Sequence, residues 1–166
     1  LSSRDRTRPL CLFVGTRHPH TVWSAERAYD PAAVKIPPTH IDTAVTREER
    51  ASYLTDVTKA DTLLGEVRAL VREKIPGDTL IIYTADHGGA WPFSKWTLYD
   101  SGVRVPLIMA WPGQLKPGTT SDAMVCWPDL LPTFIELAGG KVPAGLDGKS
   151  FAGLLRGTTA THRDRV

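Results

Sequence analysis

Three features that would define other classes of protein are missing from this 166-residue sequence. No apolar run approaches the roughly 18 residues that a membrane-spanning helix needs, so we expect no membrane partner. The formal net charge is only +2 and basic residues are interspersed with acidic ones, so no basic stripe favours nucleic-acid binding. The two cysteines, Cys11 and Cys126, lack CxxC spacing and have apolar neighbours, which favours buried thiols over disulfide partners or nucleophiles.

An initiating methionine and a signal peptide are also missing. The chain opens with Leu1-Ser2-Ser3-Arg4 and ends at Arg163-Asp164-Arg165-Val166, so we interpret it as a fragment of a longer protein, and its compartment is left open. Its length fits one domain, and 42% hydrophobic residues are enough to bury a core. We therefore expect a single domain over residues 1–166.

The apolar runs that are present are short and bounded by turn-forming residues. They predict strands at 10–14, 80–84 and 105–110, with a short fourth strand at 120–125. Residues 24–45 contain three prolines and little periodicity, which predicts a long loop.

Helical signals alternate with these strands. A capping box at Thr46-Arg47-Glu48-Glu49 predicts the start of a long helix, and Pro76-Gly77 predicts its end. A second helix is predicted from Pro128 to Gly139-Gly140, and Ser150 is expected to cap a short helix over 151–155. This alternation predicts an α/β fold in which helices cover a sheet. The apolar face of the long helix is predicted to comprise Leu54, Val57, Leu64, Val67 and Val71.

The most informative residues follow the strand at 80–84. Asp86 and His87 lie where that strand ends, and the carboxyl ends of parallel strands are where ligands gather in α/β proteins. A carboxylate oxygen and a neutral imidazole nitrogen are both metal donors, so the pair is a candidate site for a divalent cation. The alternative is a polar turn, because turns favour Asp and Gly.

Further polar side chains follow the strands at 10–14 and 80–84. His18 and His20 follow the first strand, and Lys95 lies beyond the second. Taken singly, each is also explained as an exposed or structural group. Together with Asp86 and His87, they favour an anionic substrate held by a lysine and a metal.

Five motifs in order resemble the sulfatase family, which belongs to the alkaline phosphatase superfamily. Lys95-Trp-Thr-Leu-Tyr-Asp-Ser-Gly-Val-Arg-Val-Pro106 is similar to the family's Lys-x-Thr-x-Tyr-Glu-x-Gly-x-Arg-Val-Pro segment. The other four are Thr79-Leu-Ile-Ile-Tyr-Thr-Ala-Asp-His-Gly88, Arg17-His-Pro-His20, Asp129-Leu-Leu-Pro-Thr133 and Leu146-Asp-Gly-Lys-Ser150. Within the family, the proline-rich loop and the long helix look most like the heparan N-sulfatase (sulfamidase) type.

The resemblance implies the C-terminal part of a sulfatase catalytic domain with a partial alkaline-phosphatase-like fold. Asp86 and His87 would bind a divalent metal, with Ca²⁺ favoured and Mg²⁺ or Mn²⁺ as alternatives. Lys95 and His20 would be catalytic and would contact the substrate, and His18 would be a weaker substrate contact. Arg104 is interpreted as structural. The parent protein would act on a sulfated small molecule or glycan in a periplasmic, secreted or lysosomal-like compartment.

The family's nucleophile is missing from these residues. Sulfatases convert a Cys or Ser in a Cys/Ser-x-Pro/Ala-x-Arg motif to formylglycine, and neither Cys11 nor Cys126 has that context. The resemblance places this motif upstream, together with the paired aspartates that complete the metal site. We therefore expect the 166 residues alone to be inactive.

Three functions stay open on the sequence. The first is a fragment of a sulfuric ester or N-sulfate hydrolase. The second is a phosphodiesterase or phosphonate hydrolase of the same superfamily, and the third is a truncated, non-catalytic binding domain. A sheet that lacks its first strands would expose an edge, so we also expect self-association.

Overall fold

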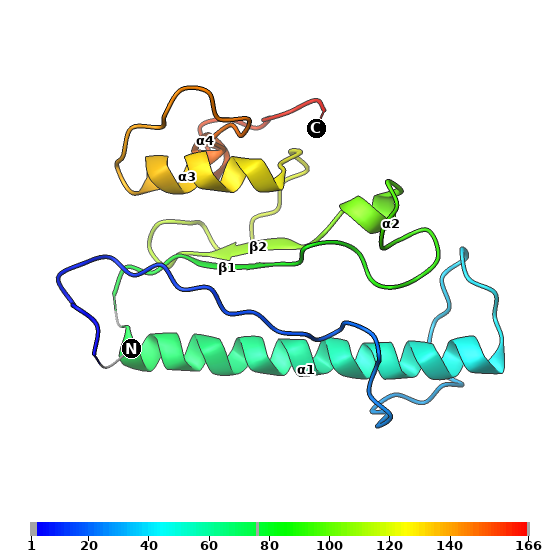
Figure 1. Ribbon diagram of the computed structural model, residues 1–166. Coiled ribbons are helices and arrows are strands. Elements are labelled where there is room, and N and C mark those ends of the chain that lie inside the picture. Colours follow the sequence, from blue (N-terminus) through cyan, green and yellow to red (C-terminus); the bar gives the residue numbers. More distant parts are fainter. Residues whose placement is uncertain (1–2, 76, 166) are drawn as a thin grey trace. The chain divides into compact units, whose positions relative to one another are not determined.

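The computed structural model describes residues 3–75 and 77–165 (Figure 1). The chain divides into two compact units, Leu1–Ile108 and Met109–Val166, each of which has its own internal packing. The single domain expected over residues 1–166 stays a prediction. No helix of the described residues is long and apolar enough to cross a membrane. The elements in order are α1 (Ala44–Lys74), β1 (Ile81–Thr84), α2 (Asp100–Val103), β2 (Leu107–Ala110), η1 (Trp127–Asp129), α3 (Leu130–Leu137) and α4 (Ala152–Leu155).

Helix α1 has 31 residues, and its N-cap lies three residues before the predicted one. The Thr43 hydroxyl accepts a hydrogen bond from the Thr46 backbone N–H at 3.1 Å, so Thr43 is the N-cap and the predicted box at Thr46 is wrong. The helix ends where predicted, with Ile75 as its C-cap and basic residues Arg72 and Lys74 in the last turn. Pro76 lies outside the described residues.

The buried face of α1 differs from the predicted apolar stripe. Thr55 and Asp56 are buried, whereas Val57 is exposed. The loop that precedes the helix covers this face and brings backbone donors that need acceptors. Ala28 N–H donates to the Thr55 hydroxyl at 2.9 Å, and Ser24 N–H donates to the Asp56 carboxylate at 3.2 Å. Polar and small side chains therefore occupy the contact that leucine and valine were expected to make.

Two of the predicted strands are present and form a two-stranded sheet, β1 beside β2. The strand predicted at 10–14 is wrong, because these residues have no regular structure and are exposed, with Phe13 at 87%. Apolar residues form a strand only where a neighbouring strand accepts their backbone hydrogen bonds, and within the described ranges they have none. The predicted strand at 120–125 is reduced to one antiparallel bridge, Met124 with Arg163.

An aromatic cluster of half-buried rings holds several segments of the first unit together. Trp23 and Trp91 stack with ring centroids 4.5 Å apart, and His40 stacks on Trp91 at 5.0 Å. The Tyr53 ring of α1 meets both indoles edge-on, at 5.5 and 5.6 Å. Arg50 lies over Tyr53 and Trp91, and burial raises the pKa of the Tyr53 phenol. The cluster joins the turn before residue 24, the helix α1 and the loop that follows β1.

The second unit is organised around the fully buried carboxylate of Asp129. It accepts hydrogen bonds from Arg163 Nε at 2.8 Å, from the backbone N–H of Lys149 at 2.7 Å and from that of Cys126 at 3.0 Å, and His162 Nε2 lies 3.1 Å away. Burial opposes ionisation of Asp129, but these donors outweigh it and hold the pKa of the carboxyl well below its usual range.

The packing around Asp129 explains two of the sequence motifs, the segments at 129–133 and 146–150. A Cβ at Gly148 would lie 1.9 Å from the Pro128 carbonyl oxygen, so only glycine fits this turn. The buried Thr133 hydroxyl donates to the Asp129 carbonyl at 2.6 Å and accepts from Phe151 N–H at 3.0 Å. These bonds fix the start of α3 against the segment that leads into α4.

Both helices predicted for the second unit are present, but the N-cap of α4 is Phe151, so the predicted cap at Ser150 is wrong. The predicted helix begins at η1, and α3 ends before Gly139, whose φ of 76° is left-handed and stops the helix.

Both cysteines are free thiols. Cys11 is exposed, so its predicted burial is wrong, whereas Cys126 is half-buried. Burial and the Asp129 carboxylate raise the pKa of the Cys126 thiol.

Candidate active site

Two of the predicted site residues, 75 positions apart in the chain, meet directly. Lys95 Nζ lies 3.1 Å from His20 Nε2. The other ring nitrogen, Nδ1, lies 2.5 Å from the Thr21 carbonyl oxygen, which can only accept, so Nδ1 carries the proton. In this tautomer Nε2 accepts a hydrogen bond from the Lys95 ammonium. The pair therefore presents one cation and one imidazole at the same point.

Backbone and indole contacts fix both residues. Lys95 N–H donates to the Gly89 carbonyl at 3.0 Å, and His20 N–H donates to the Arg17 carbonyl at 2.6 Å. The Trp23 indole N–H donates to the Pro19 carbonyl at 2.9 Å. Because Trp23 belongs to the aromatic cluster, the turn that carries His20 is attached to the other segments that the cluster holds together.

Asp86 and His87 lie together after β1, as predicted. His87 Nδ1 lies 2.8 Å from the Gly88 carbonyl, which can only accept, so Nδ1 carries a proton. The other ring nitrogen, Nε2, lies 3.3 Å from Asp86 Oδ2, while Asp86 Oδ1 accepts from His87 N–H at 3.0 Å. A carboxylate oxygen and an imidazole nitrogen, both metal-donor atoms, therefore lie 3.3 Å apart.

The pair is not a complete metal site by itself. Within residues 3–75 and 77–165, no group of three or more His, Cys, Asp or Glu side chains could hold a metal ion. Gly88 fixes the backbone after the pair, because a Cβ there would lie 1.9 Å from the Ser101 carbonyl oxygen. Gly88 N–H also donates to the Gly102 carbonyl at 3.0 Å. The two donors are therefore held by a tightly packed loop.

His18 lies at a second position, beside a residue that the sequence did not indicate. Its Nδ1 is 3.6 Å from Oδ2 of Asp56, whose side chain is 3% exposed. A cavity of about 280 Å³ opens here, lined by Arg17, His18, His20, Thr21, Val22 and Asp56. An aspartate in the middle of a long helix resembles an ordinary solvent-facing charge, so no local signal could have identified Asp56.

Arg104 was interpreted from the sequence as a structural residue. Its Nη1 lies 3.8 Å from Asp100 Oδ2, but both side chains are largely exposed, and such pairs contribute little stability. Its backbone N–H donates to the Asp100 carbonyl at 2.8 Å and so ends α2.

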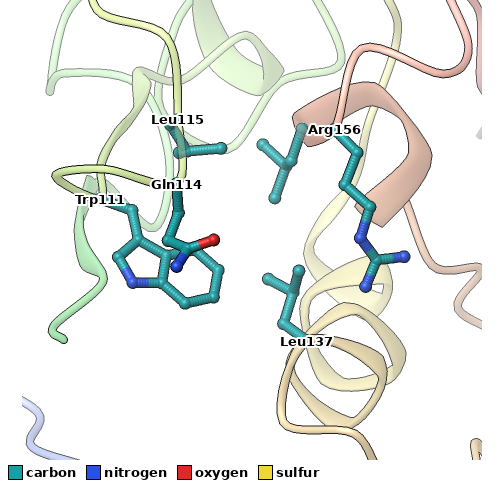
Figure 2. Close-up of a pocket in the computed structure, with 6 residues that line it drawn as sticks. Trp111, Gln114, Leu115, Leu137 and Arg156 are labelled. Atoms are coloured by element: carbon teal, nitrogen blue, oxygen red, sulfur yellow. The ribbon is translucent and has the colours of Figure 1, made fainter.

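The second unit has a smaller cavity that contains none of the predicted site residues (Figure 2). Its volume is about 150 Å³. The Trp111 indole and Gln114 face Leu137 across it, with Arg156 at its rim. Arg156 pairs with Glu136 at 2.6 Å, so the cavity offers no free catalytic group among its lining residues.

Comparisons with known protein sequences point to one family. The sulfatase family model matches residues 1–140. An ulvan-active sulfatase of Formosa agariphila is 34% identical over 157 residues, which cover 93% of this chain and 31% of the relative. Mouse steryl-sulfatase is 28% identical over 174 residues, covering 93% of this chain and 26% of the relative. The chain thus spans about a quarter to a third of the length of these relatives.

Two solved structures resemble this one. BT4656 in complex with its substrate D-glucosamine-2-N,6-O-disulfate has a TM-score of 0.63 and 28% identity, covering 76% of this chain and 27% of that chain. The phosphonate monoester hydrolase SpPMH of Silicibacter pomeroyi has a TM-score of 0.60 and 32% identity, covering 83% of this chain and 28% of that chain. These neighbours confirm the predicted α/β, partial alkaline-phosphatase-like fold.

Proposed function

Because the chain belongs to the sulfatase family, we propose that it contributes the sulfate-binding side of a sulfuric ester hydrolase active site. The observation that carries the proposal is the 3.1 Å contact between Lys95 Nζ and His20 Nε2. A cation and an imidazole at one point suit a tetrahedral anion whose charge changes during the reaction.

The contact also supports different roles for the two residues, charge neutralisation for Lys95 and proton transfer for His20. Lys95 would donate to a sulfate oxygen and neutralise part of its charge. Once Lys95 turns to the substrate, His20 Nε2 is released, while Nδ1 stays bound to the Thr21 carbonyl. His20 would then take up a proton from solvent on Nε2, becoming an imidazolium, and give that proton to the oxygen or nitrogen that leaves the sulfur atom.

We propose that Asp86 Oδ2 and His87 Nε2 are two ligands of a divalent cation, with Ca²⁺ favoured and Mg²⁺ or Mn²⁺ as alternatives. Such an ion would polarise the sulfate group as a Lewis acid. The carbonyl of Gly88 orients the His87 ring for this role. A formylglycine nucleophile and further ligands are expected from sequence outside the 166 residues, so the chain alone is expected to be inactive.

The substrate class is also a proposal. BT4656 is bound to an N- and O-sulfated glucosamine, and this likeness supports a sulfated sugar, including the N-sulfate of the heparan type. We expect a periplasmic, secreted or lysosomal-like compartment for the whole protein. Self-association through an exposed sheet edge remains expected, and sedimentation at high concentration tests it, because a purely monomeric chain would contradict it.

A phosphonate or phosphodiester hydrolase is the second candidate, because SpPMH resembles this chain at 32% identity. Sulfate monoesters, phosphodiesters and phosphonate monoesters each carry one negative charge near neutral pH, but the phosphorus compounds have a second organic substituent on the central atom that the site must accommodate. Titration of the chain with glucosamine 6-sulfate and with the phosphonate monoester phenyl methylphosphonate separates them, since a sulfatase site should bind the sulfate ester more tightly.

Binding to the described residues tests the main proposal without requiring turnover. Glucosamine 6-sulfate should shift the NMR signal of the His20 ring, and Lys95→Ala should weaken binding about tenfold or more, equivalent to about 1.4 kcal/mol. Lys116→Ala is the matched control, because Lys116 is exposed and belongs to the second unit. Equal affinity in the Lys95 and Lys116 variants would refute the proposal.

A further inference from the structure

The loop after β1 holds two non-glycine residues in the left-handed backbone region. Phe93 has φ 60° and Trp96 has φ 67°. This region is unfavourable for every L-residue with a Cβ and is most unusual for bulky side chains. Such strain persists only where the surroundings determine the backbone, and it gathers at functional positions.

Hydrogen bonds on both sides of Trp96 determine its backbone. The buried Ser94 hydroxyl donates to the Ser101 carbonyl at 2.7 Å, and the Thr97 hydroxyl donates to the Ser94 carbonyl at 2.7 Å. Thr97 N–H donates to the same Ser94 carbonyl at 3.0 Å. A Cβ on Gly102 would lie 2.4 Å from the Ser94 and Thr97 carbonyl oxygens, so the loop has no room to relax.

The two strained residues differ in what their side chains do. Phe93 meets the Tyr99 ring edge-on at 5.3 Å, which gives its conformation a structural reason. The Trp96 indole is 92% exposed and gains almost nothing from burial. Its recorded partner in the described part of the chain is the Lys95 ammonium, 5.3 Å from the ring centroid.

This contact places the indole beside the proposed anion site. Lys95 Nζ lies 5.3 Å from the indole centroid and 3.1 Å from His20 Nε2. A sulfate held by Lys95 and His20 would bring the ring to which it is attached next to the exposed indole. Pyranose rings have an apolar face of C–H groups that can lie against an aromatic ring, whereas inorganic sulfate has none.

We propose that Trp96 is a specificity residue whose indole stacks on the pyranose ring that carries the sulfate group. The inference rests on the proposed sulfate site at Lys95 and His20. It adds a ligand-recognition role for a residue whose strained, exposed conformation has no structural explanation among the described contacts. The likeness to BT4656, which binds a sulfated glucosamine, supports a sugar ring over an aryl ring.

The test compares ligands with and without the ring on the 166-residue chain. Glucosamine 6-sulfate and inorganic sulfate are titrated by calorimetry into the unaltered chain and into Trp96→Ala, Trp96→Phe and Leu98→Ala. We expect Trp96→Ala to weaken glucosamine 6-sulfate about tenfold with no change for sulfate, and Trp96→Phe to keep most of the affinity. Leu98 is 93% exposed and two residues away, so its variant should bind as the unaltered chain does.

A further variant controls for backbone effects. Trp96→Gly removes the indole and also relieves the left-handed strain, so it should lose affinity as Trp96→Ala does while melting at a higher temperature. Unchanged affinity in Trp96→Ala would overturn the inference, as would an equal loss for inorganic sulfate. Stronger binding of phenyl sulfate than of glucosamine 6-sulfate would overturn the choice of a pyranose.

Failure of the proposed function gives a different pattern. If the unaltered chain binds neither ligand, the sulfate site and the stacking role are both rejected. If Lys95→Ala abolishes binding of both ligands while Trp96→Ala binds normally, the sulfate site stands and only the role of Trp96 is rejected.

Discussion

Replacing Asp129 by alanine removes the carboxylate around which the second unit is built. The side chain is fully buried, and its two oxygens accept from Arg163 and from the backbone N–H groups of Lys149 and Cys126. Alanine leaves those donors facing a small cavity with no acceptor. The substitution therefore leaves several buried hydrogen-bond donors without the carboxylate that now accepts from them.

The magnitude follows from these partners. An unsatisfied buried donor costs about 1–3 kcal/mol, and loss of one member of a buried ion pair costs about 3–5 kcal/mol. The Arg163 side chain is 20% exposed and can turn to water, so we take about 2 kcal/mol for its lost bond and about 1 kcal/mol for each of the two backbone N–H groups, which gives an expected loss of about 4 kcal/mol. This is a large fraction of the roughly 5–15 kcal/mol that stabilises a domain.

Urea unfolding followed by circular dichroism measures this loss. Asp122→Ala is the matched control, because Asp122 is an exposed aspartate of the same unit and should change the free energy of unfolding by less than about 0.5 kcal/mol. Asp129→Asn keeps the shape but turns an NH₂ group toward donors, so it should lie between the two. A loss below about 1 kcal/mol in Asp129→Ala would refute the reasoning.

The pH dependence of the same variants checks the electrostatic part. The pKa of Asp129 is depressed in the folded chain, so its ionised form contributes stability that is fully present above the unfolded pKa of about 3.9. That contribution falls as the pH drops from about 5 toward the folded pKa. The free energy of unfolding of Asp129→Asn should therefore fall less steeply in acid than that of the unaltered chain, with slopes that differ by up to about 1.4 kcal/mol per pH unit. If the free energy of unfolding falls with decreasing pH equally in the unaltered chain and in Asp129→Asn, the depressed pKa of Asp129 is contradicted.

Three further predictions concern other features of the chain. Gly148→Ala should destabilise the second unit by more than about 2 kcal/mol, because its Cβ would meet the Pro128 carbonyl at 1.9 Å. Gly65→Ala is its control, since nothing lies within 4 Å of that Cβ and the change should stabilise α1 by about 0.5–1 kcal/mol in thermal melts. Thr43→Ala should cost about 1 kcal/mol and Thr46→Ala clearly less, and the reverse order would restore the predicted cap. Asp86→Ala should weaken the binding of Ca²⁺ or Mn²⁺ measured by calorimetry, and unchanged affinity would remove Asp86 from the metal site.

Local signals in the sequence predicted the elements whose boundaries depend on neighbouring residues. The left-handed Gly139 marks the end of α3, and the apolar runs around Ile81 and Leu107 mark β1 and β2. The cap of α1 was misplaced because Thr43 and Thr46 are both good N-caps three residues apart. Which one is used depends on which hydroxyl reaches an orphan N–H, and that is a matter of geometry.

Tertiary contacts explain what local signals could not predict. The buried face of α1 carries Thr55 and Asp56 because a loop brings backbone donors to it, so hydrophobic periodicity indicated the wrong face. The apolar run at 10–14 fails as a strand for a related reason: strand propensity needs a partner that the local sequence does not supply.

The candidate site shows the same division between local and tertiary information. The motifs assigned Lys95 and His20 to one substrate site, but their direct contact involves a turn that is held by the stacking of Trp23 on Trp91, which no periodicity predicts.

The sequence likewise gives no sign that Trp96 is left-handed. A strained backbone costs about 1–3 kcal/mol, and an indole that is 92% exposed returns little of it through burial. Natural sequences break such local rules mainly at functional or strained sites. The failure of local prediction at Trp96, one residue from the lysine that meets His20, is therefore itself an argument that this side chain is placed for a ligand.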